Sequence, residues 1–219
     1  MNKINYQKEL DKIIEQNVRE DRVPSLLLHS CCAPCSSYTI EYLSQYFKIT
    51  VLYYNPNISP KSEYEKRKSE QLRLIDEMKT KYPVSFIDCD YDYDEFLNIA
   101  KGYEACKEGG ERCFRCYRLR LERTAILAKN SAFDFFCTTL SISPLKNSQK
   151  INEIGFELEK KYGIKWLPSD FKKKEGYKRS IVLSKEYNLY RQNFCGCAFS
   201  KAESIENKER INYNKHINK

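Results

Sequence analysis

The sequence predicts an α/β fold in which a mostly parallel sheet has helices on both faces. Short apolar runs alternate along the chain with longer segments of helical periodicity, and strands separated by helices of that length are joined by crossovers that make the sheet parallel. Length and composition agree, because 219 residues with 41% hydrophobic content suffice to bury one core. We expect one domain over residues 1–219, with a core at about 25–200, an N-terminal helix and a charged C-terminal extension.

The individual elements follow from the hydrophobic pattern. Short apolar runs predict strands at residues 25–30, 48–54, 84–89, 133–139 and 164–168. Longer periodic segments predict helices at residues 1–18, 36–47, 62–81, 94–101, 113–129, 149–162 and 180–186. Residues 106–112 contain Gly109-Gly110 and predict a loop. The charged residues 201–219 form either a terminal helix or a frayed tail.

Polar and sulfur-containing residues follow the predicted strands. In open parallel sheets ligands bind beyond the carboxyl ends of the strands. We therefore expect the segments at those ends to meet on one rim: Cys31-Cys32, 55–57, Cys89-Asp90, 138–141 and 169–170. The cysteines among them place a predicted metal site at this rim.

Ten cysteines are present, and seven of them fall into three tight groups. The groups are Cys31, Cys32 and Cys35; Cys113 and Cys116; and Cys195 and Cys197. Thiolates are soft ligands that hold iron–sulfur clusters and thiophilic metals. The pair at the start of the predicted helix 113–129 also gains from the helix dipole, which favours thiolate. Cysteines 89, 106 and 137 stand alone and read as packed or surface residues.

Other roles for these cysteines remain open at this point. Disulfides need an oxidising compartment, and the N-terminal residues lack the apolar core of a secretory signal. No stretch is apolar enough to span a bilayer, so we expect a cytoplasmic protein with reduced thiols. A structural zinc site is an alternative, although it needs only four ligands. A redox dithiol at Cys113 and Cys116 is another. Iron–sulfur chemistry is favoured over both.

The charge balance is basic. Lys and Arg number 38 against 30 Asp and Glu, giving a formal net charge of +8. Such a bias allows nucleic-acid binding, although a composition rich in Lys, Asn, Ile and Tyr could produce it without one. The candidate phosphate contacts are Arg120, Lys178, Arg179, Arg191 and the run Lys172-Lys173-Lys174. Binding through them is expected to weaken with added salt.

Six motifs in order give the chain a family resemblance. They are HSCCAPCS (29–36), YNPNISPKSEYEKR (54–67), ERCFRCYRLRLERTA (111–125), FCTTLSISPLKN (136–147), SDFKKKEGYKRS (169–180) and LYRQNFCGCAFS (189–200). Together they closely resemble the QueH-type epoxyqueuosine reductases over residues 26–200. Members reduce the epoxide of epoxyqueuosine, at the wobble position of tRNA, to the alkene of queuosine, without cobalamin. This is the last step of queuosine formation.

The resemblance also implies a fold and cofactors. The family is similar to Rossmann-like, ATP-pyrophosphatase-type tRNA-modifying enzymes, but the first strand-to-helix turn here has no glycine to wrap a phosphate, so no ATP use is expected. Members hold a [4Fe–4S] cluster and a second iron, reduced by an external one-electron donor. Carried onto this chain, the cluster ligands look like Cys32, Cys35, Cys113 and Cys116, and the second-iron ligands look like Cys31, Cys195 and Cys197. Adjacent side chains on extended backbone diverge, so Cys31 and Cys32 are expected to serve different centres.

Epoxide reduction also requires a proton for the departing oxygen. Asp170 is the first candidate and Asp90 the second, because both follow predicted strands, although aspartate also commonly caps the next helix. His29 either tunes the metal through a hydrogen bond or is a packed strand-end residue. Two other functions stay in view: an ATP-using Rossmann-like tRNA thiolase, and a zinc-stabilised RNA-binding module without catalysis.

Overall fold

A five-stranded parallel sheet organises the protein. The computed structural model describes residues 4–217, and for residues 208–217 it describes the backbone. The strands lie in the order β3-β2-β1-β4-β5 and all neighbours run parallel. Their bounds are β1 (Ser25–His29), β2 (Lys48–Tyr53), β3 (Ser85–Asp88), β4 (Phe135–Thr138) and β5 (Lys165–Trp166). This arrangement confirms the predicted fold class, since a parallel sheet with the strand order 3-2-1-4-5 is Rossmann-like.

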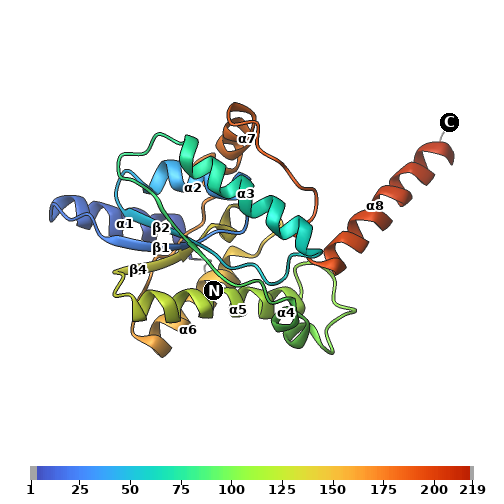
Figure 1. Cartoon of the computed structure of the whole chain (residues 1–219), viewed down its shortest axis with the longest axis horizontal. Helices are drawn as coiled ribbons and strands as arrows, with labels where there is room; N and C mark the ends of the chain where they lie inside the picture. The colour runs from blue at the N-terminus through green and yellow to red at the C-terminus, as the bar shows by residue number, and fades with distance from the viewer. Residues whose placement is uncertain (1–3, 218–219) are drawn as a thin grey trace.

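Helices cover both faces of the sheet. Figure 1 shows α2, α3 and α7 on one side and α4, α5 and α6 on the other. Their bounds are α1 (Tyr6–Arg19), α2 (Ala33–Leu43), α3 (Lys61–Glu77), α4 (Tyr93–Ala100), α5 (Glu111–Asn130), α6 (Ser148–Tyr162), α7 (Gly176–Glu186) and α8 (Ala198–Ile217). A short 3-10 helix, η1 (Thr139–Ile142), follows β4 and was not predicted. Among the described residues, none of the helices combines the length and apolarity needed to cross a membrane.

The central strand carries the core. Leu26, Leu27 and Leu28 of β1 are fully buried, because helices cover the sheet on both faces. Leu28 pairs in register with Val51 of β2 and with Cys137 of β4. Cys137 therefore packs inside the sheet, as its apolar surroundings in the sequence predict. The carboxyl ends of β1, β2 and β4 consequently lie side by side at one edge.

Two helix starts differ from the prediction in ways that concern the cysteines. α2 begins at Ala33, three residues early, because Pro34 in the first turn has a φ already suited to a helix. Cys35 thus lies inside the helix and its N–H bonds to the carbonyl of Cys32 at 3.2 Å. α5 begins at Glu111, so Cys113 is its third residue.

The C-terminal segment forms the helix that was one of two expected outcomes. α8 continues from the last cysteine group to Ile217 and, in Figure 1, extends away from the body of the protein. Residues 218–219 lie outside the described residues.

Candidate metal centre

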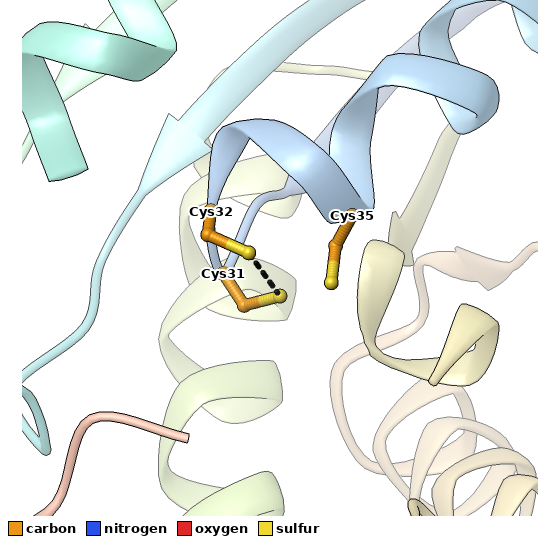
Figure 2. Close-up of side chains that lie close together, drawn as sticks. All are labelled: Cys31, Cys32 and Cys35. Carbon is orange, nitrogen blue, oxygen red and sulfur yellow. Dashed lines mark hydrogen bonds between the residues drawn. The ribbon is translucent and has the colours of Figure 1, made fainter. Parts of the chain in front are cut away.

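The first three cysteines converge on one point. Their Sγ atoms all lie within 4.8 Å of one another, and Figure 2 shows them at the start of α2. Cys31 and Cys32 have sulfur atoms 3.8 Å apart, so the expectation that these neighbours diverge is wrong. Cys32 is extended, with φ −177° and ψ 160°, but the chain enters the helix directly after it. That turn brings Cys35 onto the same side.

Cys195 and Cys197 return to the strand ends from the C-terminal region. Their sulfur atoms are 3.7 Å apart. The loop that carries them is tied to the segment after β2, because the N–H of Ser59 donates to the carbonyl of Gly196 at 3.0 Å. On α5, Cys113 accepts a hydrogen bond from the N–H of Gly109 at 3.2 Å, and Cys116 is buried.

All seven clustered cysteines line one or both of two adjoining cavities. The larger, which we call the open cavity, has a volume of about 350 Å³ and contains Cys31, Cys32, Cys35 and Cys195 in its lining. The second, which we call the inner cavity, is lined by Cys113, Cys116, Cys195 and Cys197, with other residues. Four residues line both cavities: Glu108, Arg120, Lys146 and Cys195. Each cavity therefore has four cysteines in its lining, and Cys195 is common to both, so the cavities alone do not divide the seven cysteines between two centres.

In the first and last cysteine groups, where sulfur atoms lie close together, one thiol has a lowered pKa and is therefore favoured as the thiolate. The neighbouring thiols of Cys32 and Cys35 lower the pKa of Cys31 well below its ordinary value, with help from Arg120 and Lys146. Cys197 does the same for the pKa of Cys195, again with help from Lys146. Burial raises the pKa of Cys116 to about 11. The site thus combines ready thiolates with thiols that would deprotonate on metal binding.

Arg120 lies inside the site rather than on a tRNA-facing surface. Its side chain is 3% exposed, so the structure does not support the expected role as a surface phosphate contact. Its Nε donates to Nε2 of His29 at 3.2 Å, and its Nη2 donates to Oδ1 of Asn55. Nη1 lies 4.0 Å from Sγ of Cys116. Burial and then Arg120 hold the pKa of His29 down at about 3, so this histidine is neutral.

The two candidate proton donors lie away from the cysteines. Asp170 is buried, accepts a hydrogen bond from Ser148 at 3.2 Å and forms an ion pair with Lys172. Within the described residues it lines neither cysteine cavity. Asp90 lines a separate hollow with Cys89 and Arg123. The strand ends of β1, β2 and β4 meet at the site, whereas Asp90 after β3 does not join them.

The other residues expected to contact tRNA, Arg191, Lys178 and Arg179, differ in their exposure and in their partners. Arg191 is exposed, lines the open cavity and donates to Oγ of Ser184 at 2.9 Å. Lys178 is exposed on α7, where it pairs with Glu175. Arg179 instead holds two carboxylates, Glu41 at 2.6 Å and Glu186 at 3.0 Å.

Sequence reasoning missed two charged residues at the junction of the cavities. Lys146 follows η1, is half-buried and lines both cavities. Burial alone would lower its pKa, but Cys195, Tyr117, Cys31 and Cys35 raise it overall, so it carries a positive charge. Burial, and secondly Cys195, raise the pKa of Glu108. The position of Lys146 after the β4 end could have indicated it, since the same rule singled out residues 138–141.

The donor set fits an iron–sulfur centre. Seven thiols exceed the four that one tetrahedral zinc needs, and thiolates are the usual ligands of [4Fe–4S] clusters. The buried guanidinium of Arg120 also requires negative charge nearby. The residues that could hold metal are Cys31, Cys32 and Cys35 on one side and Cys113, Cys116, Cys195 and Cys197 on the other.

Comparison with known proteins gives a consistent result. A family model described as "Epoxyqueuosine reductase QueH" matches residues 26–203. The protein of that name from Staphylococcus epidermidis is 45% identical over 214 residues, covering 96% of this chain and 90% of the relative. The one from Thermotoga maritima is 38% identical, covering 85% of this chain and 95% of the relative.

A solved structure shares the fold. The U34-tRNA thiolase NcsA from Methanococcus maripaludis, determined with its [4Fe–4S] cluster, matches with a TM-score of 0.50 at 14% identity. The match covers 96% of this chain and 79% of that chain. At this identity the likeness concerns the fold alone.

Proposed function

This chain belongs to the QueH family of epoxyqueuosine reductases, so it is an oxidoreductase that acts on tRNA, and we propose that it does so with a [4Fe–4S] cluster and a second iron. Reduction of the epoxide of epoxyqueuosine to the alkene of queuosine consumes two electrons and two protons and releases the oxygen as water. An external one-electron donor supplies the electrons. Because the substrate is tRNA, we place the enzyme in the cytoplasm.

The convergence of seven cysteines on two adjoining cavities carries this proposal. Four thiols line the inner cavity, which matches the four ligands of a [4Fe–4S] cluster. We assign the cluster to Cys113, Cys116, Cys195 and Cys197. The sulfur atoms of Cys31, Cys32 and Cys35 lie within 4.8 Å of one another and suit the second iron. Held by these three thiolates, the second iron would supply Lewis acidity toward oxygen.

When bound, the two centres supply electrons singly and Lewis acidity toward oxygen. The chain's own residues then have to hold the substrate and move protons. We place the modified base in the open cavity, because Cys31, Cys32 and Cys35 line it. Lys146 and Glu108 line it next to the cysteines, so the ammonium or the carboxyl group can donate a proton to the departing oxygen. They replace Asp170 and Asp90 as the proposed proton donors.

The rim of the open cavity provides contacts for tRNA. Arg191 lies there, and Lys178 on α7 is exposed next to Tyr177, which lines the cavity. We propose that Arg191 and Lys178 contact phosphates. Tyr177 and Phe194 line the same cavity and offer rings on which an unpaired anticodon base can stack.

Anaerobic analysis of iron, sulfide and zinc, with visible and EPR spectra, tests the cofactors. About five iron and four sulfide per chain are expected. Cys116→Ser should lower both iron and sulfide, whereas Cys35→Ser should chiefly lower iron. Cys89→Ser is the matched control, because Cys89 lines the separate hollow. One zinc without sulfide, reproduced after reconstitution, would overturn the cofactor proposal in favour of a zinc-stabilised RNA-binding protein.

Activity is tested separately with tRNA that carries epoxyqueuosine. The loaded enzyme and a chemical reductant should convert the modified nucleoside to queuosine, as seen by mass spectrometry of the digested tRNA. The conversion should proceed without ATP. Dependence on ATP, or incorporation of sulfur into the tRNA, would instead identify a thiolase.

A further inference from the structure

We propose that Arg120 is a positioning residue for the cluster, whose buried positive charge is balanced by the metal-bound thiolates and raises the reduction potential of the cluster. The inference rests on the iron–sulfur function proposed above. It assigns to Arg120 a role toward the cofactor in place of the expected contact with tRNA.

The partners of Arg120 distinguish it from the other buried arginines. Arg67 is 1% exposed and holds Glu63 at 2.7 Å. Arg112 is also 1% exposed and holds Glu203 at 3.3 Å. Arg120 is 3% exposed, and its hydrogen-bond partners in the described part of the chain are an imidazole, an amide and a thiol. Buried arginines are normally paired with an anion, so the anion expected for Arg120 is a thiolate of the cysteines that line the same two cavities.

His29 and Asn55, which hydrogen-bond to Arg120, are neutral and fixed in position, so they do not supply that anion. Nε2 of His29 lies 3.2 Å from Nε of Arg120 and 3.1 Å from the carbonyl oxygen of Tyr54, and Nδ1 lies 2.8 Å from Oγ1 of Thr138, so the imidazole is held at both ring nitrogens. Asn55 donates from Nδ2 to the carbonyl of Ser30 at 2.9 Å, which leaves its Oδ1 to face Arg120. The two partners therefore hold the guanidinium in one orientation.

That orientation directs the guanidinium toward the cysteines. Nη1 lies 4.0 Å from Sγ of Cys116, one helical turn earlier on α5. Arg120 also lines both cavities. Metal binding converts Cys116 from a neutral thiol to a thiolate, and this supplies negative charge beside the arginine.

A fixed positive charge affects the two oxidation states unequally. Reduction adds one negative charge to the cluster, so the attraction of the guanidinium is stronger for the reduced state. In a buried site this attraction is weakly screened. Arg120 therefore favours the reduced cluster and raises its potential. The same charge destabilises the metal-free protein, where fewer anions balance it.

Three variants test the proposal. Arg120→Met removes the charge and keeps much of the length, and Arg120→Lys retains a charge. Arg118→Met is the matched control, because Arg118 is on the same helix and pairs with Glu157 on the surface. For each protein we would measure the reduction potential by EPR-monitored titration, and the melting temperature with and without the cluster.

The expected result has two parts. Arg120→Met lowers the potential, whereas Arg120→Lys stays nearer to the unsubstituted enzyme and Arg118→Met does not change it. Arg120→Met also narrows the difference in melting temperature between loaded and metal-free protein. Equal potentials and equal melting differences in Arg120→Met and the unsubstituted enzyme would overturn the proposal.

If the Arg120→Met variant does not retain the cluster, the melting temperatures of the metal-free proteins test the proposal. A metal-free Arg120→Met that melts above the unsubstituted metal-free protein supports the proposal, because an unbalanced charge has been removed. One that melts lower shows that Arg120 only organises His29 and Asn55, and overturns it. An unsubstituted enzyme that binds zinc without sulfide would contradict the proposed function itself, which is a separate outcome.

Discussion

Nη1 of Arg67 donates a hydrogen bond to the carbonyl oxygen of Cys195, 3.1 Å away, and so ties the last cysteine group to α3. The same guanidinium stands 5.0 Å from the ring centroid of Phe194. Gly196 lies directly against this contact, with φ +120°. A Cβ there would meet Cγ1 of Ile58 at 2.9 Å and Nη1 of Arg67 at 3.0 Å. The position of Cys195 and Cys197 thus depends on a glycine.

We expect Gly196→Ala to displace this loop and to lower the iron and sulfide content of the purified enzyme. Gly102→Ala is the control, because Gly102 also has a positive φ, +80°, but no atom lies within 4 Å of the added Cβ. Both substitutions should cost about 1–2 kcal/mol of stability through backbone strain. Equal iron content in the two variants would contradict the role given to the close contact.

Lys146→Met should lower kcat by a factor on the order of 10²–10⁴ if the ammonium protonates the departing oxygen. Lys146→Arg should recover part of the loss, because it keeps a cationic donor. Steady-state conversion of epoxyqueuosine in tRNA at saturating tRNA measures kcat. The control is Lys150→Met, which removes a lysine paired with Glu153 on α6. A Lys146→Met enzyme with normal kcat and weakened tRNA binding would make the lysine a binding residue.

Arg191→Ala should weaken tRNA binding and reduce the slope of log affinity against log salt by about 1, as the loss of one phosphate contact requires. Arg179→Ala should leave that slope nearly unchanged, because Arg179 is engaged with Glu41 and Glu186. Its effect should appear in the melting temperature, since it joins α2 to α7. Filter binding at several salt concentrations distinguishes the two, and equal slopes for both variants would argue against this assignment.

The stability of the sheet should depend on pH through Asp134. Partial burial raises the pKa of this carboxyl, but hydrogen bonds from the N–H and the hydroxyl of Ser25, at 2.8 and 2.7 Å, lower it overall. A carboxyl with a lowered folded-state pKa stabilises above its unfolded pKa of about 3.9, and this contribution disappears as the pH falls through the folded-state value.

Asp134→Asn should therefore be less stable than the unsubstituted protein at pH 7, by about 1 kcal/mol for an exposed, charge-assisted pair. The difference should shrink between pH 7 and an acid pH at which the carboxyl is protonated in the folded protein. Urea denaturation of both metal-free proteins at the two pH values provides the measurement. A difference that is the same at both would show that the charge of Asp134 is unimportant.

Much of the fold could be predicted because the strands are apolar and short. The predicted run 25–30 corresponds to β1 (Ser25–His29), and 48–54 corresponds to β2 (Lys48–Tyr53). Helix starts were harder to place. α2 begins at Ala33 because Pro34 suits a first turn, but a sequence of cysteines has no periodicity that reveals this.

The site was predictable only where the residue type itself indicates chemistry. Cysteine spacing identified the seven ligands proposed above. Arg120 was misread, because its neighbours Arg118 and Arg123 make the helix look like an exposed basic face. The spacing of four from Cys116 to Arg120 was the overlooked signal, since residues at that separation share a helix face. Asp170 follows its strand as expected, but Lys172 engages it in an ion pair, which no sequence pattern indicates.

The distribution of the cysteines along the chain determines when the enzyme can be completed. During synthesis the trio at the start of α2 emerges together with β1 and α2, whereas Cys195 and Cys197 emerge only after β5 and α7. Domains fold as the chain leaves the ribosome, N-terminal parts first. The loop of Gly196 can take its place only after α3 and the C-terminal segment have come together. On the proposed function, the inner cavity would therefore receive its metal only after these segments have met, and its thiols would be open to oxidation until then.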